Sequence, residues 1–433
     1  MRVVHFSRFV ASAGAHRFAG PEYDDASTGA CRVRVVESAA SISVPFATIA
    51  TSSRVAVRSP WLRSVLWDGF WMQSALWLVP IALWLAWGYA DPAKSPLDLL
   101  YFGLTALFWI GHRVSSTYLA YCTEAYRPLL RTQPIRFVVL PLLIAAGCFA
   151  IFLPPDDALP WPRQERLIWL AIVDYAFVTY HFAAQHFGAL SIYRSRAGRS
   201  GCPWTRRMDR AFALLIGGLL VLVADLLAGA VAYQSEWTGR GYLPDLLVST
   251  QDEIRLVATV LLLATTAVVL LAEIRSAQSS LPRLLYIVGI AIMVGIALQP
   301  RSLFLFLVIW TSQHWILAVG LTSQTVSKEP APRGGFRGAF HHVNIRPWAL
   351  VGVLLAVSVL LLPVFEVEAL GPGDTFYGDR IFGAIGAALR TSIWVPALVA
   401  LGFATGFIHY LLDRSVYRFS NAQVRAAASG LMR

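Results

Sequence analysis

Ten runs of apolar residues, each about as long as a lipid bilayer is thick, constrain this chain more than any other feature. A helix needs about 20 apolar residues to cross a hydrocarbon core about 30 Å thick. The runs cover residues 68–90, 98–120, 135–154, 166–192, 211–233, 254–274, 283–299, 302–323, 347–365 and 388–411. The pattern predicts an all-α fold, a polytopic integral membrane bundle of about ten transmembrane helices.

The composition fits a membrane protein and argues against other classes. Only 14% of the 433 residues are charged, whereas a soluble domain carries about 25%. The net charge of +11 comes from basic residues in short loops between the apolar runs. It therefore indicates membrane topology, and we expect no nucleic-acid partner. The four cysteines have no CxxC spacing, which argues against a zinc ribbon or a disulfide framework.

The loop charges alternate along the chain. Lys and Arg collect on the cytoplasmic side of membrane proteins. Basic clusters precede the first run and follow the second, fourth, sixth, eighth and tenth, while the other loops are poorer in basic residues and often acidic. The alternation predicts that both termini are cytoplasmic. We expect a multi-pass protein of the cell inner (cytoplasmic) membrane, in contact with membrane lipids.

Three parts are expected along the chain. Residues 1–62 lack the layout of a signal peptide and are interpreted as a disordered cytoplasmic N-terminal tail. Residues 63–414 form the transmembrane helical domain, and residues 415–433 form a cytoplasmic C-terminal tail. Because the loops are too short for a soluble catalytic domain, any chemistry must take place in or beside the bilayer.

Several polar residues lie inside the apolar runs, where each costs several kcal/mol unless it is paired. Estimated from the helical rise, His112, His181 and His314 all lie about 20 Å from the cytoplasmic boundary charges, and His186 about 12 Å. Asp225 lies at a depth similar to the first three. The other polar candidates are Arg113, Asp174, Gln185 and Gln313.

Imidazoles that converge from separate helices make a metal site, and imidazole suits iron, copper and zinc. The sequence predicts such a site with His112, His181, His186 and His314 as ligands. Contacts with the ligating histidine rings or with the substrate are expected from Asp225, Gln185, Gln313, Arg113, Asp174, Tyr118 and Trp315. Phe187 and Trp310 are expected as further aromatic walls. No catalytic residue is assigned.

Two histidine positions complicate this site. His181 and His186 are five residues apart, about 140° around an ideal helix, so they can share one metal only if their helix contains a π-bulge. His409 is about a turn from Asp413 and Arg414 and is interpreted as interfacial. His341 and His342 are interpreted as solvated loop residues.

The segment Tyr180-His181-Phe-Ala-Ala-Gln185-His186-Phe187-Gly, with histidines on several spans and very short loops, resembles the Brp/Blh-type β-carotene dioxygenases. The resemblance implies a non-haem iron, held by four histidines, that cleaves a carotenoid within the bilayer. The resemblance assigns the role of metal ligand only to His112, His181, His186 and His314. The chain departs from that family in its five-residue histidine spacing and in the order of its histidines. The HxxxH and HxxHH boxes of membrane desaturases do not occur.

Three functions follow as hypotheses. The first is a metal-dependent oxygenase or oxidoreductase, with iron as the expected metal, that acts on an apolar lipid or isoprenoid small molecule and could use an electron donor. The second is a haem-b electron-transfer or quinone-reactive membrane protein. The third is a transporter or lipid-handling protein without redox chemistry.

Overall fold

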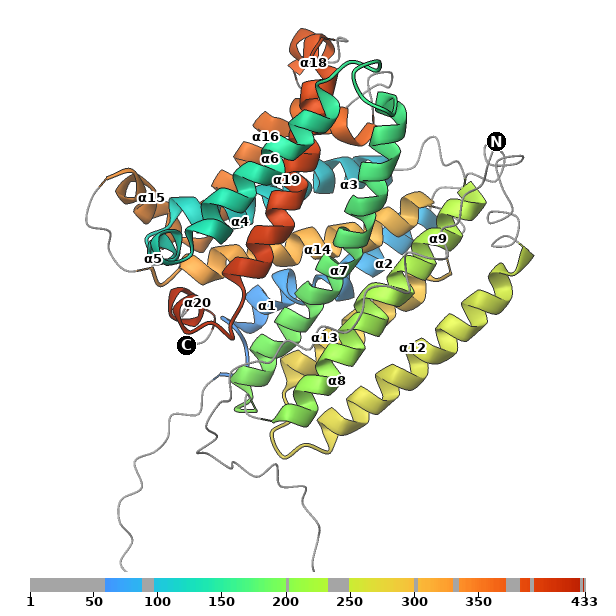
Figure 1. The fold of residues 1–433 in the computed structure, drawn as a ribbon. Coiled ribbons are helices and arrows are strands. Elements are labelled where there is room, and N and C mark those ends of the chain that lie inside the picture. The colour runs from blue at the N-terminus through green and yellow to red at the C-terminus, as the bar shows by residue number, and fades with distance from the viewer. Residues whose placement is uncertain are drawn as a thin grey trace, which may run out of the picture. The chain divides into compact units, whose positions relative to one another are not determined.

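A computed structural model describes residues 59–87, 97–199, 202–232, 249–299, 303–329, 335–370, 382–389, 393–428 and 431. The chain divides into two units, residues 1–41 and 42–433, and every described residue belongs to the second unit. The described residues form helices and connections, with no β-strand among them (Figure 1). The expected all-α fold is therefore confirmed. Most of the predicted N-terminal tail, up to residue 58, lies outside the described residues.

Each apolar run falls mainly on helical residues. The first four runs correspond to α1 (Val65–Trp71) with α2 (Ser74–Trp87), α3 (Leu97–Leu104) with η2 (Thr105–Trp109) and α4 (Ile110–Cys122), η3 (Ile135–Val139) with α6 (Leu140–Phe152), and α7 (Arg163–Arg196). The next three correspond to α8 (Pro203–Leu214) with η4 (Leu215–Leu219) and α9 (Leu220–Ala232), α12 (Gln251–Ile274), and α13 (Leu281–Ala297). The last three correspond to α14 (Leu303–Val326), α16 (Pro347–Leu370) and α19 (Val395–Val416). Shorter helices are α5 (Arg127–Thr132), α15 (Phe336–Asn344), α18 (Ala384–Leu389) and α20 (Ala422–Ala427).

Among the described residues, six helices are long and apolar enough to cross a membrane. They cover Ile135–Phe152, Arg163–Arg196, Pro203–Ala228, Gln251–Ile274, Pro347–Phe365 and Val395–Val416. A seventh span results if α1 and α2, which meet at an angle of 53°, are counted as one. These helices are compatible with a multi-pass membrane protein. The number of ten spans and the cytoplasmic placement of both termini remain predictions.

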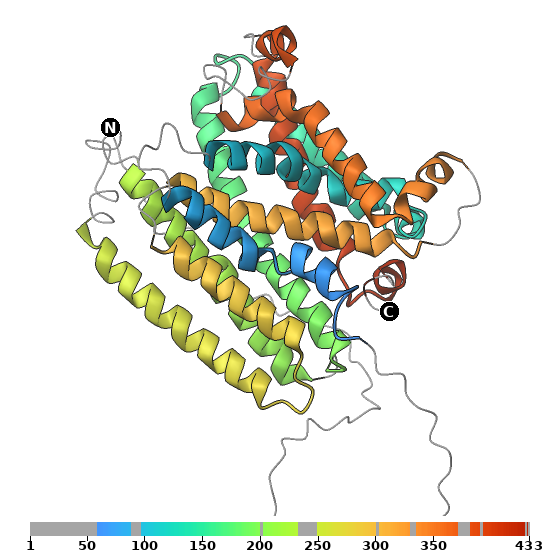
Figure 2. The same cartoon turned by 180° about the vertical axis from the view of Figure 1, so that it is seen from behind.

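Two helices, α14 and α19, each pack against several others. α19 packs against α4, α6, α7 and α16, while α14 packs against α2, α4, α13 and α16 (Figure 1). α12 lies at the edge, against α8 and α13, in both views (Figures 1 and 2). Its outer side chains Leu256, Val260 and Leu263 are more than half exposed. A helix with such an apolar outer face suits contact with lipid.

Two of the π-helical segments adjoin the histidines. π-helical turns inside α-helices occur frequently at functional sites. η2 ends three residues before His112, and η4 carries Gly217 against His186 of α7. A Cβ on Gly217 would lie 2.4 Å from Cδ2 of His186. The glycine therefore allows η4 to approach α7 closely.

We expect Gly217→Ala to lower the thermal stability of the purified protein, because the methyl group must displace His186. Overpacking of this kind costs about 1–3 kcal/mol. Gly188→Ala is the matched control, because it lies in helix α7 and a Cβ there would meet nothing within 4 Å. Thermal unfolding in detergent compares the two variants. Equal unfolding temperatures for both would contradict the close contact.

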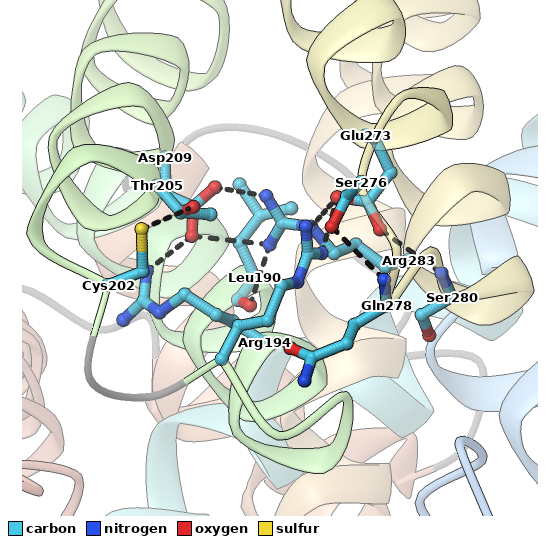
Figure 3. Close-up of polar contacts among 11 residues, drawn as sticks. Leu190, Arg194, Cys202, Thr205, Asp209, Glu273, Ser276, Gln278, Ser280 and Arg283 are labelled. Atoms are coloured by element: carbon cyan, nitrogen blue, oxygen red, sulfur yellow. Dashed lines mark hydrogen bonds and ion pairs between the residues drawn. The ribbon is translucent and has the colours of Figure 1, made fainter. Parts of the chain in front are cut away.

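A buried ion-pair network joins four helices (Figure 3). Arg283 of α13 binds Asp209 of α8, and its Nε is 2.8 Å from Oε2 of Glu273 of α12. Arg194 of α7 also binds Asp209, and Arg199 Nη2 is 2.5 Å from Oε2 of Glu273. All five side chains are buried. Because each carboxylate binds two arginines, the network fixes α8 and α12 against α7 and α13.

Replacing Arg283 with Met should destabilise the fold, because Asp209 and Glu273 each lose one charged partner. The expected cost is about 1–3 kcal/mol. It lies below the 3–5 kcal/mol typical of a fully broken buried pair, because Arg194 and Arg199 remain. Arg207→Met, on the exposed side of α8, is the control. If Arg283→Met lowers the unfolding temperature no more than Arg207→Met does, the network contributes little to the stability of the fold.

Candidate metal centre

Four buried histidines, one from each of four helices, meet inside the bundle. They are His112 on α4, His181 on α7, His314 on α14 and His409 on α19. The ring centroids of His112 are 4.2 Å from His409, 4.4 Å from His314 and 5.7 Å from His181. The centroid of His181 is 4.8 Å from both His314 and His409. The common depth expected for His112, His181 and His314 agrees with this arrangement.

Three of these histidines direct nitrogens at one point. Nε2 of His409 is 2.9 Å from Nε2 of His112 and 3.2 Å from Nε2 of His181. One ligand atom from each of the three lies within 4.8 Å of the others. Imidazole nitrogens bound tetrahedrally at about 2.0–2.1 Å from a metal lie about 3.4 Å apart. The group His112, His181 and His409, called the histidine triad below, could therefore hold a metal ion.

His314 packs on the histidine triad without belonging to it. Its ring stands edge-on to both His112 and His181, with interplanar angles of 86° and 83°. The ring also contacts Phe182, with centroids 3.8 Å apart. His314 thus forms part of the wall around the triad and is the nearest further imidazole.

The interpretation of His409 as interfacial is wrong. The residue is 2% exposed, and it supplies the nitrogen closest to both other members of the triad. Its Nδ1 is 2.9 Å from Oγ of Ser116, which lies one turn after His112 on α4. A partner on Nδ1 fixes the orientation of an imidazole whose Nε2 binds a metal.

Asp413, which the sequence also placed at the membrane boundary, is buried beside the triad. Its Oδ2 is 3.8 Å from Nε2 of His181, and it lies one turn after His409 on α19. Just beyond the end of α19, Tyr417 is 3.1 Å from Thr322 through their hydroxyl groups. Burial, with Asp413 nearby, raises the pKa of Tyr417, which therefore stays protonated. The spacing of His409 and Asp413, four residues apart on one helical face, is the sequence signal that could have identified both.

His186 does not join the triad. α7 is α-helical from Arg163 to Arg196, with no π-bulge between His181 and His186. His186 therefore points elsewhere, and its Nδ1 is 2.9 Å from the hydroxyl of Tyr286 on α13. The expectation that His186 could share the site thus fails, because the bulge it requires is absent.

A cavity of about 380 Å³ opens beside the triad. Besides the histidines, its aromatic lining is Trp109, Tyr175, Phe182, Trp310, Trp315, Phe403 and Tyr410. Trp310 and Trp315 were expected there, whereas Tyr118 and Phe187 are not among the lining residues. Tyr118 instead donates a hydrogen bond to Oδ1 of Asn344 over 2.6 Å. The cavity is large enough for a small apolar ligand or for one segment of a long one.

The lining also includes three charged residues, Arg113, Asp174 and Asp225. Arg113 lies over the rings of Trp109 and Phe365, with its Cζ 5.1 and 5.2 Å from their centroids. Asp225 accepts a hydrogen bond from Tyr175. Asp174 lies near Gly406, since a Cβ there would be 3.8 Å from Oδ1 of Asp174 and 3.4 Å from Nη2 of Arg113. These groups place polar contacts around an otherwise aromatic cavity.

The two glutamines predicted near the metal have different surroundings. Gln185 donates a hydrogen bond from Nε2 to the backbone carbonyl of His314 over 3.2 Å. Gln313 is fully buried, and neither its amide nitrogen nor its amide oxygen has a hydrogen-bond partner. Gln185 thus supports the backbone at His314, while Asp225 pairs with Tyr175 and bonds to no histidine ring.

No protein-family profile, curated protein or solved structure matches this chain. The functional argument therefore depends on the geometry of the histidine triad and the cavity beside it. Together these define a helical, membrane-compatible protein with a buried group of histidines that could bind a metal ion.

Proposed function

We propose that the protein is a membrane metal-dependent oxygenase, with non-haem iron bound by the histidine triad, that acts on an apolar lipid or isoprenoid substrate. The convergence of three imidazole nitrogens from three helices carries this proposal. Such convergence requires several buried polar groups to meet at one depth. Histidines that served only in helix packing would not have to lie at the same depth. In a membrane interior, that arrangement favours function over stability.

The donor set fits a transition metal of the first row. Neutral imidazoles suit iron, copper and zinc, and histidines combined with a carboxylate are typical of non-haem iron oxygenases. Asp413 supplies the carboxylate at the edge of the triad. Nδ1 of His112 and Nδ1 of His314 are buried without a hydrogen-bond partner. When bound, iron would supply the capacity to activate dioxygen.

The chain's own residues would bind and orient the reactants. Trp310, Trp315 and Phe182 offer apolar surface for a hydrocarbon segment, while Arg113 and Asp225 lie within reach of a polar end group. Cleavage of a carbon–carbon double bond by dioxygen balances without a reductant, because each oxygen atom ends in one carbonyl product. Hydroxylation would place one oxygen atom in water and would require two electrons and two protons from a separate donor.

The haem-b alternative fits the triad less well. Two imidazoles that bind one haem iron on opposite faces have nitrogens about 4 Å apart, twice a metal–nitrogen bond of about 2.0 Å, with the porphyrin between them. The distance of 2.9 Å between Nε2 of His409 and Nε2 of His112 favours a single ion without a macrocycle. The transporter hypothesis predicts that the triad carries protons and holds no metal.

The proposal is tested on full-length protein purified in detergent after growth with iron. We expect about one iron per chain, no haem bands in the reduced-minus-oxidised visible spectrum, and a ferrous nitrosyl signal in electron paramagnetic resonance after addition of nitric oxide. Incubation with a membrane lipid extract under ¹⁸O₂ should yield labelled products. Protein that binds neither iron nor another transition metal would contradict the proposal and favour the transporter hypothesis.

A further inference from the structure

A second cavity, of about 400 Å³, carries a concentration of positive charge. Arg63 precedes α1, Arg196 ends α7, and Lys328 follows α14, and all three line this cavity. No acidic residue is among its lining residues. Three cations around one cavity repel each other, and a bound anion would offset that repulsion. The cavity is called the basic cavity below.

Buried hydrogen bonds hold one wall of the basic cavity in place. Asp68 is fully buried, and its carboxylate accepts hydrogen bonds from the backbone N–H groups of Leu62 and Arg63, over 2.7 and 3.1 Å. Tyr193 donates a further hydrogen bond to it over 3.0 Å. Both carboxylate oxygens of Asp68 are therefore hydrogen-bonded within the protein. The side chain of Arg63 lines the cavity.

Arg196 is fixed by the same wall. Its Nη2 donates a hydrogen bond to the carbonyl of Leu62 over 2.9 Å, which ties the end of α7 to the segment before α1. An arginine whose position is set in advance loses less entropy when it binds an anion. Arg63 is likewise oriented, with its Cζ 4.7 Å above the ring of Trp67.

The floor of the basic cavity contains a buried polar side chain. Gln324 is 4% exposed, and its Oε1 has no hydrogen-bond partner. Beside it, Ser327 donates a hydrogen bond from Oγ to the carbonyl of Gln324 over 2.8 Å. An unsatisfied buried amide oxygen costs about 1–3 kcal/mol unless a ligand supplies a donor.

We propose that the basic cavity binds a phosphate group, either of an anionic phospholipid or of a soluble phosphate compound. Arginine and lysine form charge-assisted hydrogen bonds with phosphate oxygens, and these are about twice as strong as neutral ones. The three cations belong to the loop charges that predict the cytoplasmic side of the membrane, where anionic headgroups lie. Trp61, also in the lining, is typical of this interfacial depth.

The test uses the full-length protein in a zwitterionic detergent and three probes: phosphatidylglycerol, diacylglycerol and inorganic phosphate. Thermal unfolding and native mass spectrometry report binding. We expect phosphatidylglycerol to raise the unfolding temperature and diacylglycerol to leave it unchanged. Arg196→Gln should weaken phosphatidylglycerol binding about tenfold, through the loss of one charge-assisted contact. Arg207→Gln, exposed on α8, is the matched control and should bind as the unaltered protein does.

If only phosphatidylglycerol saturates the basic cavity, its ligand is a lipid headgroup. If inorganic phosphate saturates the cavity equally well, its ligand is a soluble phosphate compound. Both outcomes support a phosphate site. Equal shifts with phosphatidylglycerol and diacylglycerol, or equal affinities for the Arg196→Gln and Arg207→Gln proteins, would overturn it. If Arg196→Gln does not fold, the exposed positions Arg63→Gln and Lys328→Gln replace it. Metal content, measured in the same samples, keeps this result separate from the proposed function.

Discussion

Replacing His409 with alanine is expected to remove the metal from the purified protein. Nε2 of His409 is 2.9 Å from Nε2 of His112 and 3.2 Å from Nε2 of His181, so its loss removes one of the three converging nitrogens. Structural zinc sites with about four ligands bind with about 10–16 kcal/mol, which is about 2.5–4 kcal/mol for each ligand. The metal affinity should therefore fall about a hundredfold to a thousandfold. Metal analysis after equilibration with a chelator measures the change.

Two controls separate ligand loss from general damage. His342→Ala removes an exposed histidine on α15, and we expect full metal content. His186→Ala removes a buried histidine from the same helix as His181, where its partner is Tyr286. It should lower stability while keeping the metal. If His186→Ala loses the metal and His409→Ala retains it, the assignment of ligands is wrong.

His314 is the position at which the same measurement is most informative. Its ring packs on the histidine triad, yet its nitrogens are not in the converging set. A loss of affinity in His314→Ala as large as that in His409→Ala would add it as a fourth ligand. A smaller loss would assign it to the wall of the site.

Hydropathy predicted the helices well because the length and composition of a segment are enough to identify a long apolar helix. The apolar run at 166–192, for example, coincides with the longest helix, α7. Which helices are neighbours was not predictable in this way. The arrangement of α4, α7, α14 and α19 around the site depends on packing between segments far apart in sequence, including the close approach at Gly217.

The depth estimate found His112, His181 and His314 but missed His409, for a physical reason. The neighbouring charges Asp413 and Arg414 were taken to mark the membrane boundary. Asp413 is in fact only 8% exposed, and α20 follows closely in the chain, with Val424 buried. A carboxylate that is buried beside a histidine shares its site, whereas the same residue in a loop would mark the bilayer surface. Sequence position alone does not separate these cases.

The second large effect is expected at Asp413, which lies beside the histidine triad. Changing Asp413 to asparagine replaces the carboxyl group 3.8 Å from Nε2 of His181 with an amide and keeps the shape of the side chain. Loss of an outer partner of a ligating histidine typically weakens metal binding about 10–100-fold. Ser116→Ala removes the partner of Nδ1 of His409 but no charge, so its loss should lie at the lower end of that range. Asp157→Asn, at an exposed position in the loop before α7, is the control for the loss of an acidic side chain away from the site. Chelator competition gives the three affinities, and the nitric oxide signal shows whether the remaining iron has changed its surroundings.

An unchanged affinity in Asp413→Asn with an altered signal would make the carboxylate a group at the substrate side of the site. An unchanged affinity with an unchanged signal would remove Asp413 from the metal centre, and with it the observation that favours iron over zinc.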